Sequence, residues 1–343
     1  MERGVLTLAP EERERLVGWL PHLAGRRVLV VGDLCLDEYI VGRAQRLSRE
    51  APVPVLEYQR RFLVPGAAAN PALNIRALGG VAAVAGVVGQ DEEGRSLADL
   101  LGGWDIDGTG LVVDSSRSTT VKTRILAEVS LRFPQQVARV DRQERRPLDR
   151  GVQRQVLARL EALAPGADAV LISDYKSGVV DRGLVQAICH LAQERGMLVT
   201  VDSQGDLDKF RGATVIKCNQ EEAAAFLRRA LQRDDDFARA ARLLQRRLGA
   251  QAVIITRGSS GMSVASNEET CAHLPAVNRS EVYDVTGAGD TVIATLTLAL
   301  AAGVPLVDAA HLANYAAGIV VRRLGNATTS PQELARTILG VET

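Results

Sequence analysis

The chain of 343 residues is poor in aromatic side chains and carries no excess charge of either sign. Phe, Trp and Tyr together make up 3% of it, while Ala, Val and Leu are plentiful, a composition that suits helices packed closely on a sheet. Lys plus Arg and Asp plus Glu number 41 each, so the formal net charge is zero. A neutral chain has no general attraction to nucleic acid or to an acidic membrane, and we expect neither as a partner.

Cysteines are also few, and their spacing excludes two common uses. They form no CxxC pair and have no histidine at ligand spacing, and they lie at Cys35, Cys189, Cys218 and Cys271. This argues against a zinc site or a disulfide scaffold and fits a reducing cytoplasm. Residues 1–27 lack the apolar segment of a signal peptide, and the longest apolar run, 291–303, is too short to span a bilayer.

What the sequence does contain is a regular alternation of strand-like and helix-like segments. Continuous apolar runs followed by turn residues predict buried parallel strands at 27–33, 169–174, 197–202, 213–219 and 252–258. Helices are predicted near 10–24, 150–164, 181–195, 220–230 and 236–248. The alternation predicts an α/β fold with a doubly wound, mostly parallel sheet flanked by helices.

Two segments interrupt this alternation, 39–64 and 118–141, where alternating patterns predict β-structure. They indicate a small β-sheet inserted into the α/β core. Such a sheet over the ligand edge would act as a lid. Because the chain shows no repeat, low-complexity tract or linker, residues 1–343 are expected to form one domain.

Polar side chains stand at the ends of the predicted strands, where open α/β sheets bind their ligands. They are Asp33, Asp174, Asp202, Asn219 and Thr256. Asp and Asn at such positions also cap the helices that follow, so each is either a ligand-binding residue or a cap.

The most informative motif is Asp284-Val-Thr-Gly-Ala-Gly-Asp-Thr291, directly before the apolar run 292–302. Small residues at 287–289 leave backbone amides exposed at a helix start, where the helix dipole favours an anion such as a phosphoryl group. Asp290 would lie in the first turn, where a carboxylate can accept the proton of an attacking hydroxyl. The alternative is a plain helix start in which Asp290 only complements the dipole.

A second motif, Gly66-Ala-Ala-Ala-Asn70-Pro-Ala-Leu-Asn74-Ile-Arg-Ala-Leu-Gly79, lies upstream. Together the two motifs resemble the signatures of the PfkB/ribokinase-type carbohydrate kinases. The resemblance covers nearly the whole chain and is closest to the branch that phosphorylates heptose 7-phosphate, through residues 32–37, 47–55, 135–141, 173–175 and 283–290. It implies a ribokinase-like fold and transfer of the γ-phosphoryl group of ATP, with Mg2+, to a hydroxyl of a sugar or sugar phosphate.

The resemblance also implies roles for individual residues. Asp290 would be the general base, and Gly287, Ala288 and Gly289 would form the anion hole. The sugar would be bound by Asp37, Gly66 and Asn70. A distal phosphate of the sugar would be read by residues of the predicted lid, which could equally be solvated surface groups: Lys122, Arg124, Gln136 and Arg139.

On the donor side, Asn219 and Glu222 match the family's Asn-x-x-Glu motif, which positions Mg2+ and ATP largely through water. Thr256 and Gly258 would flank the nucleotide phosphates, and Asn314 would approach the adenine. The sequence leaves open whether a monovalent cation assists.

The chain departs from the family pattern at several positions. Ala67 stands where relatives usually have glycine, and alanine costs about 1 kcal/mol if φ is positive there. Pro71 removes a backbone donor. Gln204 stands where the heptose kinases carry lysine, and Lys176 lies one residue earlier than their second lysine, followed by Ser177. The missing and displaced cations favour a changed substrate.

Three other functions therefore stay open beside the heptose 7-phosphate kinase. One is a kinase for another sugar, sugar phosphate or nucleoside, and another is a non-catalytic sugar- or nucleotide-binding sensor. The third, a nicotinamide-dependent oxidoreductase, is disfavoured because the chain lacks a GxGxxG motif, and the lack of GxxxxGK[ST] excludes a P-loop enzyme. We expect a homodimer, because the β-strands of a lid can pair between subunits.

Overall fold

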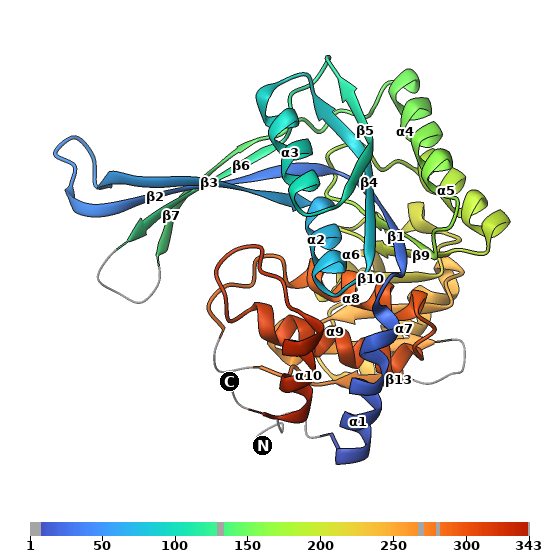
Figure 1. The fold of residues 1–343 in the computed structure, drawn as a ribbon. Helices are drawn as coiled ribbons and strands as arrows, with labels where there is room; N and C mark the ends of the chain where they lie inside the picture. The colour runs from blue at the N-terminus through green and yellow to red at the C-terminus, as the bar shows by residue number, and fades with distance from the viewer. Residues whose placement is uncertain (1–7, 129–133, 267–270, 279–281, 342–343) are drawn as a thin grey trace.

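The computed structural model describes residues 8–128, 134–266, 271–278 and 282–341 (Figure 1). A nine-stranded sheet forms its centre, with the strand order β13-β12-β11-β10-β9-β8-β1-β4-β5. The pairs from β11 to β5 are parallel, and β12 and β13 are added antiparallel at one edge. Its strands are β1 (Arg27–Gly32), β4 (Val81–Gly89), β5 (Asp107–Asp114), β8 (Ala169–Ser173), β9 (Leu198–Asp202), β10 (Val215–Asn219), β11 (Ala252–Thr256), β12 (Met262–Ser266) and β13 (Cys271–Leu274).

Helices cover both faces of this sheet (Figure 1). Successive side chains of a strand point to opposite faces, so Val28 and Val30 join one apolar core and Leu29 and Val31 the other. The first core contains residues of α1 (Pro10–Trp19), α2 (Ala69–Ala77), α3 (Glu92–Gly103), α8 (Ala288–Ala301), α9 (Leu306–Val320) and α10 (Pro331–Leu339). The second contains residues of α4 (Arg150–Leu163), α5 (Arg182–Arg195), α6 (Gln220–Leu227) and α7 (Asp234–Leu248).

A separate four-stranded sheet projects from the body of the molecule (Figure 1). It has the order β3-β2-β6-β7 and consists of β2 (Leu34–Leu47), β3 (Pro54–Ala67), β6 (Val121–Glu128) and β7 (Gln135–Arg142). We call it the small sheet. The segments predicted as a lid, 39–64 and 118–141, largely coincide with these strands, although residues 129–133 lie outside the described part of the chain. Because β2 follows β1 after a single residue, the base of the small sheet adjoins the carboxyl edge of the large one.

The structure confirms the predicted α/β architecture and the five predicted strands to within two residues at either end. The helix predicted at 10–24 is α1 continued by a 3-10 turn, Leu20–Leu23, whose Pro21 has no amide hydrogen to continue the α-helical pattern. Within the described residues, no helix is long and apolar enough to cross a membrane.

Candidate active site

The polar residues that end the central strands divide between structural and pocket-lining roles. Asn219 caps α6, accepting a hydrogen bond from the Glu222 amide at 2.8 Å. Asp33 accepts the amides of Tyr175 and Ser177 at 2.7 and 3.0 Å and so fixes the loop after β8. Asp202 lines a polar pocket at the start of α8, which Asn219 also borders. Both roles that the sequence analysis left open, capping a helix and lining a pocket, therefore occur at this edge of the sheet.

The start of α8 has the geometry predicted from its motif. Gly287 is the N-cap residue with φ +76, and a Cβ there would lie 2.7 Å from the Asn70 amide nitrogen, so only glycine fits. Ala288 and Gly289 follow in the first turn, next to Asp290. The Ala288 amide donates to the Val285 carbonyl at 3.2 Å, so the amide of one of the three predicted anion-hole residues is already paired. Backbone amides without helical partners at this end, together with the helix dipole, favour an anion.

Asp290 is the centre of the site, with 6% of its surface exposed. One carboxylate oxygen accepts a hydrogen bond from the Tyr175 hydroxyl at 2.6 Å, and the other accepts one from the side-chain NH2 group of Asn70 at 2.7 Å. Burial raises the pKa of Asp290 to about 6, helped by the nearby charge of Asp202 and opposed by the two hydrogen bonds. A carboxylate with this pKa is a competent proton acceptor near neutral pH.

The orientation of Asn70 is itself fixed by a second asparagine one turn later on α2. The Asn74 amide donates to the Asn70 side-chain oxygen at 3.3 Å, and the Asn74 oxygen accepts from the Thr291 hydroxyl at 2.9 Å. Because Asn70 must then present its NH2 group to Asp290, it contacts the carboxylate directly. The sequence placed Asn70 in a sugar pocket, and the structure places it against the predicted base.

Asp37 lies on β2 and is buried. Arg124 donates to one of its oxygens at 2.6 Å, and Asn326 donates to the other at 2.7 Å. Gly66 on the paired strand makes this approach possible, because a Cβ there would lie 2.3 Å from an Asp37 oxygen. Asn326 also comes close to Gly287, where its side-chain oxygen would lie 3.1 Å from an added Cβ. Asp37 and the start of α8 are thereby joined through one asparagine.

The four polar residues predicted to read a distal phosphate do not form one cluster. Lys122 lies with its ammonium 4.9 Å from the centre of the Tyr175 ring. Arg124 and Gln136 line a second pocket of about 290 Å³ beneath the small sheet. Arg139 is exposed on β7 and pairs with Asp141 through two contacts of 2.9 Å. Of the four residues, Lys122 lies next to Tyr175, and Arg124 is already paired with Asp37.

Ala67 has φ 51, so the left-handed conformation suspected from the sequence is present. A residue other than glycine in this conformation destabilises the folded state by about 1–2 kcal/mol. Replacing alanine with glycine increases the entropy of the unfolded chain, which lowers the free energy of unfolding by about 0.4–1 kcal/mol. We expect Ala67→Gly to raise the free energy of unfolding by about 0.5–1 kcal/mol in urea titrations. Ala68→Gly, at φ −57, is the matched control and should lower it. Equal losses in both variants would contradict the strain at Ala67.

A polar pocket of about 160 Å³ lies between the start of α8 and the ends of β9 and β10. Lys217 lies in it with its ammonium 2.8 Å from an Asp202 oxygen. Burial alone would lower the pKa of Lys217, but the Asp202 carboxylate reverses this and raises it, so the side chain stays charged. Gln204 lines the same pocket. A lysine ammonium thus lies in the pocket that Gln204 lines, supplied by β10 and paired with Asp202.

Asn219 and Glu222, predicted to position Mg2+ and ATP, border this pocket and hydrogen-bond to each other. The Asn219 backbone and side-chain nitrogens both donate to the Glu222 carboxylate at 2.8 Å. Burial raises the pKa of Glu222 to about 7. No group of three or more His, Cys, Asp or Glu in the described ranges could hold a metal ion.

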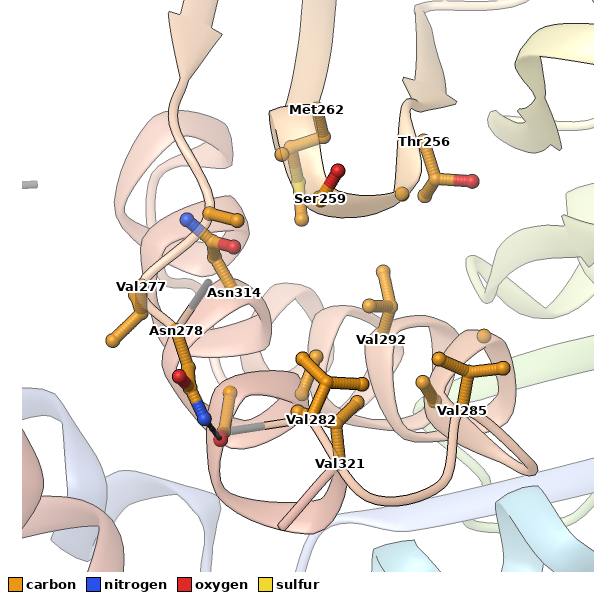
Figure 2. Close-up of a pocket in the computed structure, with 17 residues that line it drawn as sticks. Thr256, Ser259, Met262, Val277, Asn278, Val282, Val285, Val292, Asn314 and Val321 are labelled. Carbon is orange, nitrogen blue, oxygen red and sulfur yellow. Dashed lines mark hydrogen bonds between the residues drawn. The ribbon is translucent and has the colours of Figure 1, made fainter. Parts of the chain in front are cut away.

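A mostly apolar pocket of about 260 Å³ lies on the other side of Gly289, which lines both cavities (Figure 2). Thr256 and Met262 lie opposite Val282, Val285 and Val321. Gly258 and Asn314, both predicted for nucleotide binding, are also among its lining residues. The side-chain NH2 group of Asn314 donates to the Pro275 carbonyl at 2.8 Å. An apolar cavity that meets a polar one at a helix start suits a ligand with a flat base and phosphates.

Several residues of the site were not predicted as such from the sequence. They are Asn74, Tyr175, Lys217 and Asn326. A lysine inside the apolar run of β10 is the one signal that could have been noticed, because a buried lysine requires a partner.

The fold of this chain matches those of several solved structures. Escherichia coli phosphofructokinase-2, solved with fructose-6-phosphate, matches with a TM-score of 0.73 and 21% identity, over 93% of this chain and 99% of that one. Arabidopsis thaliana ribokinase, solved with ribose and ATP, matches with a TM-score of 0.71 and 16% identity, over 92% and 99%. The fold is a ribokinase-like α/β fold.

The sequence comparison is more specific. Residues 26–333 match the model of the pfkB family carbohydrate kinases, and the chain belongs to this family. It is 42% identical over 324 residues to the bifunctional protein HldE of Geobacter metallireducens and 40% identical over 324 residues to that of Paramagnetospirillum magneticum. These matches cover 94% of this chain and 65% of each relative. The protein is a sugar kinase.

Proposed function

We propose that this kinase transfers the γ-phosphoryl group of ATP to a hydroxyl of a sugar phosphate, with heptose 7-phosphate as the leading acceptor. The proposal is carried by Asp290, a buried carboxylate with a pKa of about 6 in the first turn of α8, next to Gly287 and Gly289. Similarity to HldE proteins and the sequence stretches shared with the heptose kinase branch support the acceptor. Lys217 weakens one argument against it, because its ammonium lies in the same pocket as Gln204.

The acceptor would lie between Asp37 and Asp290, which are linked through Asn326 and Gly287. Asp37 would accept hydrogen bonds from sugar hydroxyls, and Asp290 would take the proton of the attacking hydroxyl. The amides of Gly287 and Gly289, together with Lys217, would stabilise negative charge on the transferred group. The apolar pocket around Val292 would hold the adenine of ATP.

Asn219 and Glu222 would position magnesium through bridging water molecules. The ion supplies charge neutralisation on the nucleotide phosphates when bound. Because the Glu222 pKa lies near 7, the negative charge that faces the ion grows as the pH rises through neutrality. A monovalent cation stays a prediction, as do the homodimer and the cytoplasmic location.

The acceptor class can be tested by turnover of Mg2+ and ATP against heptose 7-phosphate, fructose phosphates, ribose and nucleosides. We expect heptose 7-phosphate to give the highest kcat/KM. Lys122→Met should raise KM for a phosphorylated acceptor about 10- to 150-fold, since a charge-assisted hydrogen bond contributes about 1.5–3 kcal/mol, and leave KM for ATP unchanged. Arg60→Met, which removes an exposed cation paired with Glu128 on the small sheet, is the control.

Each other outcome has a definite meaning. Preference for an unphosphorylated sugar or a nucleoside would establish the alternative kinase. Sugar binding without turnover of any acceptor would favour the sensor. An equal loss in Lys122→Met with phosphorylated and unphosphorylated acceptors would mean that Lys122 does not read the phosphate.

A further inference from the structure

A tyrosine outside both family motifs contacts the proposed base directly. The Tyr175 hydroxyl donates to one Asp290 oxygen at 2.6 Å, while Asn70 holds the other oxygen. We propose that Tyr175 is a positioning residue for phosphoryl transfer, which aims the Asp290 carboxylate at the acceptor hydroxyl and keeps it ionised. This inference rests on the proposed role of Asp290 as the base.

The backbone of Tyr175 is fixed independently of Asp290. Asp33, buried at the end of β1, accepts the amides of Tyr175, Ser177 and Val179 at 2.7, 3.0 and 3.1 Å. One carboxylate therefore holds three amides of the short loop between β8 and α5. The phenol projects from a support that does not depend on the bond it makes to Asp290, as a positioning residue requires.

The ring of Tyr175 is held from the side of the small sheet. The Lys122 ammonium on β6 lies 4.9 Å from the ring centre, within the range of a cation–π contact. Lys122 is in register with Asp37 on the adjacent strand β2. Tyr175 thus contacts both Lys122 on the small sheet and the Asp290 carboxylate on α8.

The chemistry of the pair gives this contact a function beyond packing. A neutral phenol that donates to a carboxylate stabilises its ionised form, which opposes the effect of burial on Asp290. Burial and the Asp290 charge raise the pKa of Tyr175 itself well above its ordinary value, so the phenol remains a donor over the working pH range. Asn70 alone would leave one Asp290 oxygen without a donor in a buried site.

The test is the pH dependence of kcat for Tyr175→Phe, which keeps the ring and removes only the hydroxyl. A hydrogen bond to a charged group is worth about 1.5–3 kcal/mol, so the midpoint of the acid limb should rise by about one to two pH units. Tyr315→Phe removes a buried tyrosine hydroxyl in α9, away from the site, and should keep the wild-type midpoint. An unchanged midpoint in Tyr175→Phe would overturn the proposal.

A second measurement does not require turnover. In protein labelled with 13C at aspartate carboxyl groups, the Asp290 signal is identified by its loss in Asp290→Asn and then titrated in wild type and Tyr175→Phe. The Asp290 pKa should be higher in Tyr175→Phe by the same one to two units, about 1.4 kcal/mol each. Equal values would contradict the positioning role, whereas an Asp290→Asn variant with full activity would instead contradict the proposed function.

Discussion

Asp290→Asn should lower kcat by about 100- to 10,000-fold, the contribution typical of a positioned general base. The amide keeps the size of the carboxylate and can still bond to Asn70 and Tyr175, so the site should keep its shape. The affinity for Mg2+ and ATP should change little, because the base faces the acceptor. The measurement is ADP release at saturating acceptor, together with nucleotide binding by calorimetry.

The same substitution should stabilise the fold. Asp290 has a folded-state pKa of about 6 against an ordinary value of 3.8, so its ionised form is disfavoured in the fold and costs stability above pH 6. The uncharged amide removes that cost, on the order of 1–3 kcal/mol at pH 8 and less as the pH falls toward 4. A gain in stability together with a loss of activity is the result expected of a residue kept for function.

Asp105→Asn is a matched control. Asp105 is an exposed aspartate whose positive φ of 55 asparagine also tolerates, and it pairs with Arg76 on the surface. It should leave kcat and the stability nearly unchanged. An Asp290→Asn enzyme within tenfold of wild type would place the base elsewhere.

The parts of the site that the sequence predicted are those encoded locally. Residues 287–289 and Asp290 occupy consecutive positions at one helix start, so the motif alone defines their backbone geometry. The central strands were visible because they are continuous apolar runs. β4 was missed, although it is buried, because Val81–Gly89 contains three alanines and two glycines, which have low β-propensity.

The parts that the sequence could not predict depend on long-range pairing. Asn326 lies 289 positions from Asp37, and no local pattern connects a loop residue to a strand residue at that separation. The sequence could not predict the contact of Asn70 with Asp290, because it exists only once α2 packs against α8. Lys217 meets Asp202 because parallel pairing places the two opposite each other, a register that neither strand specifies alone.

Lys217→Met should weaken both stability and catalysis. The substitution leaves Asp202, 8% exposed, without its partner, and breaking a buried ion pair in this way costs about 3–5 kcal/mol. Because Asp202 borders a pocket, we expect the free energy of unfolding, measured with denaturant, to fall by an amount near the lower end of this range. The Lys217 ammonium would also lie 3.0 Å from a Cβ at Gly289, so it faces the proposed anion hole, and kcat should fall about 100- to 1,000-fold.

The two effects can be separated by the double variant Asp202→Asn/Lys217→Met. With neither charge left buried and unpaired, the free energy of unfolding should return to within about 1 kcal/mol of wild type. Activity should stay low, because the pocket still lacks the cation that Gln204 cannot provide. If the double variant instead regains activity along with stability, Lys217 only neutralises Asp202, and the loss of a cation at Gln204 again becomes an argument for a different acceptor.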